Sequence, residues 1–144
     1  MGKNELDFPK EKGYQAYSAV YVPSTKNKNQ PIRPSEHEKR AREVANFMTK
    51  EFGGSTSLKG KGQYVESEGK HKGRIDRENV IIVENFSDYS DYKKKDEKVK
   101  AFLEQKAKEW GQESVAFEFE APDKARRSVL VFPSKDKRKM RDVS

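Results

Sequence analysis

Four β-branched residues in a row, Val80-Ile81-Ile82-Val83, constrain the fold of this chain more than any other stretch. Charged residues stand close on both sides of the run, which is too short for a buried helix. A short apolar run of this kind is typical of a strand covered on both faces. We therefore expect a central strand over about 74–84, with the other elements arranged around it.

Hydrophobic periodicity predicts the remaining elements. Alternation of apolar and polar residues marks strands, and apolar residues three and four positions apart mark helices. A capping box, Ser35 with Glu38, is expected to begin the first helix, and Gly53-Gly54 to end it. In chain order we expect a strand over 14–22, a helix over 35–52, strands over 63–67 and 74–84, a helix ending near 110, and strands over 114–121 and 128–132.

This order is β-α-β-β-α-β with one more hairpin strand at the end. It predicts an α+β, ferredoxin-like fold in which two helices cover one face of an antiparallel sheet. With 32% hydrophobic and 38% charged residues, the 144-residue chain can close one modest core. We expect a single domain over 14–133, a mobile N-terminal arm over 1–13 and a basic C-terminal tail over 134–144.

Two helices cannot cover both faces of the sheet. The first strand should place Tyr17, Ala19 and Tyr21 on the uncovered face, beside aliphatic side chains of the central strand. An exposed apolar patch of this kind usually marks an interface. The sequence therefore predicts a homodimer packed sheet to sheet, or a partner on this face. The alternative is that the N-terminal arm or the last strand of the chain folds over it.

Basic residues dominate the charge, which is +7 overall. Such a charge favours anionic partners. At one end of the domain we expect the start of the first helix, with Arg33, His37 and Arg40, to form an anion site. At the opposite end we expect a basic hairpin that could follow a phosphate backbone. The hairpin residues are Lys70, His71, Lys72, Arg74 and Arg77.

Catalytic motifs are scarce in this sequence. There is no cysteine, no metal-ligand cluster around either histidine, and no phosphate-binding P-loop in the glycine-rich stretch 53–62. We therefore expect no cofactor and no metal. There is also no apolar run of membrane-spanning length and no signal-peptide core, so we expect a cytoplasmic protein without a membrane partner.

Three functions stay open at this point. The first is a small non-enzymatic binding module that contacts nucleic acid or a nucleotide through the basic hairpin and tail. The second is a protein-interaction or inhibitor protein that docks through its sheet face or a charged edge. The third is a small dimeric enzyme with a pocket around Arg33, His37 and Gln112. The charge distribution favours the first.

Three short segments carry a resemblance to a known family. They are Gly60-Lys61-Gly62-Gln63-Tyr64, Arg77-Glu78 at the start of the aliphatic strand, and Gly111-Gln112-Glu113-Ser114-Val115 after the second helix. Together they resemble a small bacterial family of uncharacterised domains, over about 14–120. The resemblance implies a ferredoxin-like fold and no particular activity. The basic tail and the lysine-rich loops depart from the family's pattern.

Overall fold

The structure, a computed structural model, describes residues 16–27, 29–67 and 69–133. The predicted N-terminal arm and basic tail lie outside these residues. The elements are β1 (Ala16–Pro23), β2 (Thr25–Lys26), β3 (Gln30–Pro31), α1 (Pro34–Phe52), β4 (Thr56–Val65), β5 (Ile75–Ser87), α2 (Tyr89–Glu109), β6 (Val115–Ala121) and β7 (Lys124–Val131).

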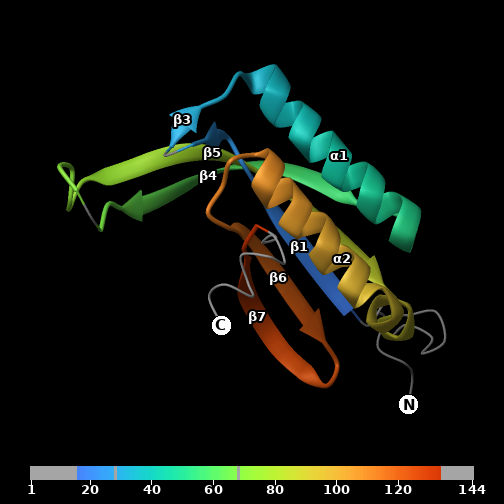
Figure 1. Ribbon diagram of the computed structural model, residues 1–144. Helices are drawn as coiled ribbons and strands as arrows, with labels where there is room; N and C mark the ends of the chain where they lie inside the picture. The colour runs from blue at the N-terminus through green and yellow to red at the C-terminus, as the bar shows by residue number, and fades with distance from the viewer. Residues whose placement is uncertain (1–15, 28, 68, 134–144) are drawn as a thin grey trace, which may run out of the picture.

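One antiparallel sheet organises the domain. Its strand order is β4-β5-β1-β6-β7, and both helices lie on the same face, as Figure 1 shows. The predicted α+β, ferredoxin-like arrangement is confirmed, with β7 added as a hairpin strand beside β6. The run 80–83 lies in β5, which pairs with β4 on one side and β1 on the other. Neither helix is long and apolar enough to span a membrane.

The core fills the space between the sheet and the helices. Val20 and Val83 from the two central strands meet Val44 of α1 and Leu103 of α2, and each is at most 1% exposed. Phe47 of α1 and Phe102 of α2 stack with ring centroids 3.9 Å apart. Burial of these large apolar side chains, at roughly 1.5–3 kcal/mol each, is the main force that holds the layers together.

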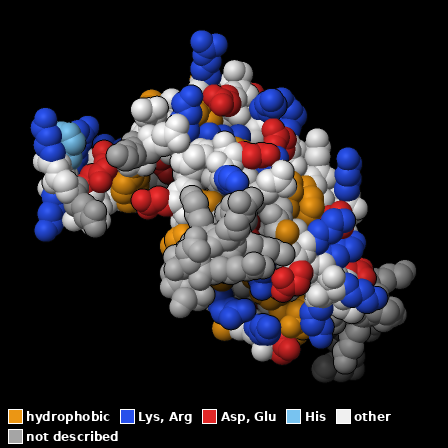
Figure 2. All heavy atoms as spheres, in the orientation of Figure 1, with side chains coloured by type: hydrophobic (Ala, Val, Ile, Leu, Met, Phe, Trp, Pro, Cys, Tyr) orange, Lys and Arg blue, Asp and Glu red, His pale blue; other side chains and the backbone are white. Residues whose placement is uncertain are grey.

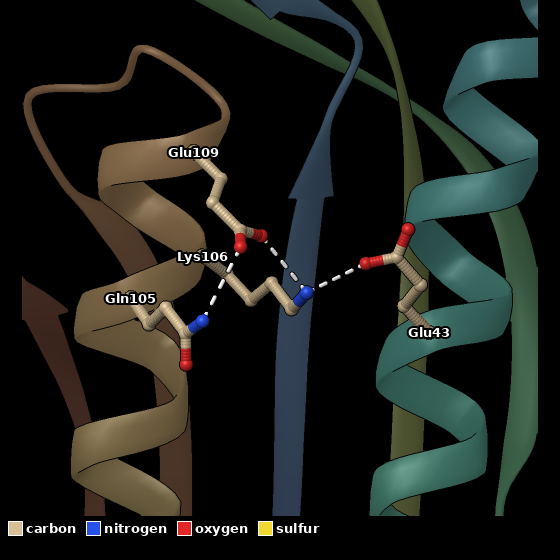
Figure 3. Close-up of polar contacts among 4 residues, drawn as sticks. All are labelled: Glu43, Gln105, Lys106 and Glu109. Carbon is tan, nitrogen blue, oxygen red and sulfur yellow. Dashed lines mark hydrogen bonds and ion pairs between the residues drawn. The ribbon is translucent and has the colours of Figure 1, made fainter.

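A lysine also joins the two helices across their exposed side (Figure 3). Lys106 Nζ of α2 lies 2.6 Å from Glu43 Oε2 of α1 and 2.9 Å from Glu109 Oε2 of its own helix. Gln105 Nε2 donates to the other oxygen of Glu109 at 3.3 Å. The lysine head is therefore held between two carboxylates, one from each helix.

Two local predictions were wrong. The helix α1 begins at Pro34, with Arg33 as the N-cap and no side-chain cap hydrogen bond, so Ser35 does not cap it. Proline at the first helical position has the φ angle that a helix needs, which explains the earlier start. The sequence also predicts a loop over 55–61, and residues 56–61 belong to β4 instead. Gly60 and Gly62 pair with Val80 and Glu78 of β5, so cross-strand pairing overrides the local preference.

The β4–β5 hairpin is longer than the sheet that supports it. β1 pairs with β5 only from Val80 onward, whereas β4 pairs with β5 back to Ile75. Residues 61–65 and 75–79 therefore form a two-stranded extension, which we call the arm. It projects well beyond the helices on the left of Figure 1. Consequently, side chains on the arm are positioned mainly by pairing within the hairpin.

Candidate active site

A cavity of about 420 Å³ lies where the arm meets the loop between β1 and α1. Ser24, Thr25 and Asn29 contribute from the loop, and the charged side chains come from the arm and from the turn that joins its strands. An adjoining open space of about 910 Å³ shares Asn29 and Glu66 with it and continues to residues 111–114. Three segments far apart in sequence thus converge here. We call the 420 Å³ cavity the arm cavity.

The arm and the residue that directly follows its first strand present three carboxylates and a phenol to this cavity. Tyr64 lies opposite Asp76 across the hairpin, and Gly62 lies opposite Glu78. Alternate residues of a strand share a face, so Tyr64, Asp76 and Glu78 point to the same side. Glu66 continues this row, and the Glu66 N–H donates to the Arg74 carbonyl at 2.9 Å. The strand pairing therefore gathers acidic side chains around one aromatic ring.

Their proximity changes their acidities. The pKa of Glu66 is raised, first by a hydrogen bond with the Asp76 carboxyl, then by burial and by the Asp76 charge. Burial raises the pKa of Glu78, and the electrostatic interaction with the nearby His37 partly offsets this increase. Burial also raises the pKa of the Tyr64 phenol, with further contributions from the three carboxylates. Clustered acids with raised pKa values are frequent in functional sites.

Replacing Asp76 by asparagine should lower the pKa of Glu66 toward its ordinary value. The substitution removes a like charge and the shared hydrogen bond, both of which favour protonated Glu66. With a raised pKa, Glu66 favours the folded state at low pH, and this contribution is lost as the pH rises through its titration. The measurement is a ¹³C NMR titration of the Glu66 carboxyl, with the distant Asp88→Asn as control. An unchanged titration in Asp76→Asn would contradict the pairing.

Basic side chains surround the acidic cluster. His71, Arg74, Arg77 and Lys61 also line the arm cavity. Arg77 Nε donates to Gln63 Oε1 at 2.7 Å, and Arg74 Nε lies 3.6 Å from Asp76 Oδ1. Figure 2 shows lysines, arginines and a histidine gathered at the far end of the arm. The cavity can therefore hold a molecule that carries both positive and negative charge.

The start of the first helix and the basic hairpin, which were predicted to lie at opposite ends of the domain, lie at the same end. We expected His37 and His71 at opposite ends, yet His37 influences Glu78, and His71 lines the same cavity as Glu78. The reason is the antiparallel pairing: the exit of β1 at Pro23 lies beside Val80, near the start of β5. The arm consequently lies next to the first turn of α1. Lys70 and Lys72 are exposed at the tip of the hairpin, and Arg33 is exposed before α1.

Arg40 was expected to bind an anion, and the structure gives it another role. The side chain is 4% exposed, and Nη1 donates to the carbonyls of Pro23 at 2.8 Å and Thr25 at 2.9 Å. Nη2 donates to the Trp110 carbonyl at 3.4 Å, and the guanidinium lies 5.3 Å from the centre of the Trp110 ring. Arg40 therefore holds the loop after β1 against the end of α2.

His37 and Gln112 are also structural. His37 Nε2 donates to the Val22 carbonyl at 2.9 Å in a buried position. Gln112 Nε2 donates to the carbonyls of Thr25 and Trp110. These residues do not surround a pocket with Arg33. They fix the two loops that border the arm cavity, and so they position the site without lining it.

Gly111 is expected to tolerate no side chain. Its φ is +62°, and an added Cβ would lie 2.4 Å from Asn27 Oδ1 and 3.2 Å from the Asn27 nitrogen. That nitrogen donates to the Gly111 carbonyl at 3.0 Å. Gly111→Ala should therefore cost about 1–2 kcal/mol of the free energy of unfolding, because a left-handed alanine is strained. Urea denaturation measures this. Gly54→Ala, with open space around its Cβ position, is the control and should change stability much less.

The uncovered face of the sheet holds Tyr17, Ala19 and Tyr21, as the alternation predicts. Tyr17 donates to Glu84 Oε2 at 2.8 Å, and Tyr21 donates to Glu118. Burial and the hydrogen bond to Glu84 raise the pKa of Tyr17 to about 12. Ala19 is fully buried between these residues and their neighbours. The use of this face by a second copy stays a prediction.

Sequence reasoning missed most of the arm cavity. Tyr64, Glu66 and Asp76 were not proposed as site residues. The available signal was a pair of residues two positions apart on each side of a glycine-containing turn. The pairs are Tyr64 with Glu66 before the turn and Asp76 with Glu78 after it. In a hairpin this spacing places all four on one face. No group of three or more histidines, cysteines or carboxylates in the described ranges is arranged to hold a metal ion.

The fold is similar to that of a phage SAM lyase. One solved structure of that enzyme, in complex with S-methyl-5'-thioadenosine, superposes with a TM-score of 0.54 at 15% identity, over 82% of this chain and 91% of the other. A second, in the apo state, superposes with a TM-score of 0.54 at 14% identity, over 90% of this chain and 100% of the other. Neither a protein family nor a curated protein matches the sequence.

This comparison corrects the functional prediction. A non-enzymatic binding module was the favoured reading, whereas the fold is similar to that of phage SAM lyase, which is an enzyme. The comparison therefore favours the enzyme alternative. The arm cavity lies beside Arg33, His37 and Gln112, the residues that were predicted to surround an enzyme pocket.

Proposed function

We propose that this protein is an enzyme that cleaves S-adenosylmethionine, or a closely related sulfonium nucleoside, in the arm cavity. The observation that carries the proposal is the row of carboxylates around Tyr64. The substrate has a sulfonium, an ammonium and a carboxylate. Carboxylates and an aromatic ring attract the two cations, and arginine or lysine attracts the carboxylate. The shared fold with phage SAM lyase supports the same reading.

The residues divide into three roles under this proposal. Glu66 and Asp76 bind the ammonium of the amino-acid arm, which keeps its charge during cleavage. Arg74, Arg77 or Lys61 binds the carboxylate, and the Tyr64 ring lies against the sulfonium methyl group or the adenine. The raised pKa of Glu66 also makes it a stronger proton acceptor than an ordinary carboxylate. Asn29 and Thr25 offer hydrogen bonds to the nucleoside.

The chemistry is a cleavage without water. The bond between the sulfonium sulfur and the γ-carbon of the amino-acid arm breaks, and both electrons remain on sulfur. S-methyl-5'-thioadenosine then leaves as a neutral thioether. The amino-acid portion of the substrate then follows one of two routes. Its own carboxylate oxygen forms a bond to the γ-carbon and closes a lactone, or it loses a β-proton to a base such as Glu66. Both routes balance without a cofactor or a second substrate.

The test is direct analysis of products. Purified protein is incubated with S-adenosylmethionine in H₂¹⁸O, and the products are separated by liquid chromatography and mass spectrometry. Formation of S-methyl-5'-thioadenosine with an unlabelled lactone or a vinyl amino acid supports the proposal. Incorporation of ¹⁸O into the hydroxyl group of homoserine would show hydrolysis instead, whereas ¹⁸O in its carboxyl group would come from later opening of the lactone. No turnover by a correctly folded protein would contradict the proposal.

A further inference from the structure

A second cavity, of about 300 Å³, lies on the helix-covered face of the sheet between α2 and β7. We call it the α2–β7 groove. It shares no lining residue with the arm cavity, and it lies near the start of α2 and of β7. Two helices cover five strands here, with α1 packed on β5 and α2 on β6 and β7. The edge of the sheet beyond α2 is therefore left partly open.

The floor of the groove is apolar. Phe117 and Phe119 of β6 and Leu103 of α2 are each at most 7% exposed and form its base. Val129 of β7 is 41% exposed, so an apolar side chain faces solvent at this point. Burial of such a surface by a ligand is favourable in proportion to the apolar area that leaves water.

The rim of the groove is cationic. Lys93, Lys100, Lys124 and Arg127 line it, and Asp96 is the one acidic residue among the described residues that line it. Lys100 Nζ lies 3.0 Å from Asp96 Oδ2, and Lys93 lies over the Tyr89 ring at 4.6 Å. A further acid, Asp123, accepts a hydrogen bond from Tyr89 nearby. Among the described residues of 16–133, Lys124 and Arg127 take part in no ion pair, and both line the groove.

We propose that the α2–β7 groove binds a small anionic amphiphile, an unbranched aliphatic carboxylate. The hydrocarbon chain lies on the Phe117, Phe119 and Val129 floor, and the carboxylate lies between Arg127 and Lys124. Charge complementarity selects the anionic head, and the volume of the groove, at the lower end of the usual range for small ligands, limits the chain length. This site is independent of the activity proposed for the arm cavity.

The probe is decanoate, used below its micellar concentration and followed by ¹H–¹⁵N NMR titration of the full chain. Saturable shifts are expected in α2, β6 and β7 and not in the arm. Octanoate and hexanoate should bind progressively more weakly, by about fourfold for each CH₂ removed. Decyltrimethylammonium, with a similar tail and a cationic head, should not bind.

Two adjacent arginines provide a matched pair of variants. Arg127 lies on the groove side of β7, whereas Arg126 lies on the other face, near Glu118 and Tyr17. Arg127→Gln should weaken decanoate binding about tenfold, the size expected for loss of one charge-assisted hydrogen bond. Arg126→Gln should leave it unchanged. Thermal unfolding checks that both variants fold.

Any of four results would overturn the proposal. The first is no saturable binding of decanoate to the wild-type chain. The second is equal weakening by the two arginine variants. The third is equal binding of decanoate and decyltrimethylammonium, which would indicate a merely apolar patch. An acidic amphipathic peptide that binds the groove when decanoate does not would assign it to a protein partner and would also overturn the proposal.

Discussion

Replacing Arg40 by alanine is expected to lower the free energy of unfolding by about 3 kcal/mol or more. The guanidinium donates to three backbone carbonyls from two loops, and each hydrogen bond to a charged group contributes about 1.5–3 kcal/mol. The substitution leaves the carbonyls of Pro23, Thr25 and Trp110 without this donor and removes the contact with the Trp110 ring. Urea denaturation followed by tryptophan fluorescence and circular dichroism measures the loss.

Two further variants make this result specific. Arg40→Lys keeps the charge but not the planar fork of donors, and should recover only part of the stability. Arg33→Ala removes an exposed arginine one residue before the same helix, and should change stability by no more than about 0.5 kcal/mol. A similar effect of Arg33→Ala and Arg40→Ala would mean that Arg40 does not hold the loops.

Replacing Glu66 by glutamine is expected to reduce kcat/KM for cleavage of S-adenosylmethionine about 100-fold. The variant keeps the shape of the side chain and removes the charge that would position the substrate ammonium, and misplacement of a substrate alone can cost two orders of magnitude. Initial rates of S-methyl-5'-thioadenosine release, measured at several substrate concentrations, separate the effect on kcat from that on KM.

The control for Glu66→Gln lies on the same hairpin. Lys70→Gln also changes one charge, at the exposed tip outside the lining of the arm cavity, and should alter kcat/KM less than twofold. Equal losses in the two variants would assign the effect to the net charge of the arm. Full activity in Glu66→Gln would remove this carboxylate from the mechanism.

The fold was predictable because its determinants are local. The run 80–83, the apolar stripes of the two helices and the alternation in β6 each specify an element and the side that is buried. The length of the arm, by contrast, could not be predicted from the sequence. The glycines of 60–62 are poor strand formers, and only pairing with β5 makes them extended, which no local pattern reports.

The site was less accessible to sequence reasoning, for two physical reasons. In an antiparallel sheet the exit of β1 lies beside the start of β5, and placing the basic hairpin at the opposite end of the domain wrongly separated His37 from Glu78. The buried position of Arg40 depends on its hydrogen bonds to three backbone carbonyls. Every residue has a backbone carbonyl, so the identities of the residues do not show which carbonyls will accept these bonds. Exposed arginines and buried ones look alike in sequence.

Because the arm is a two-stranded ribbon, its strand pairing also restricts which insertions the chain can accept. Val65 and Ile75 lie opposite each other on the arm, 60% and 57% exposed, on the face that alternates with the one bearing Tyr64 and Asp76. Adding one residue to either strand would rotate every side chain beyond it to the other face. The arm can therefore lengthen only in steps of two residues in each strand. Within the turn between Glu66 and Arg74, single insertions carry no such penalty, so variation in length should accumulate there.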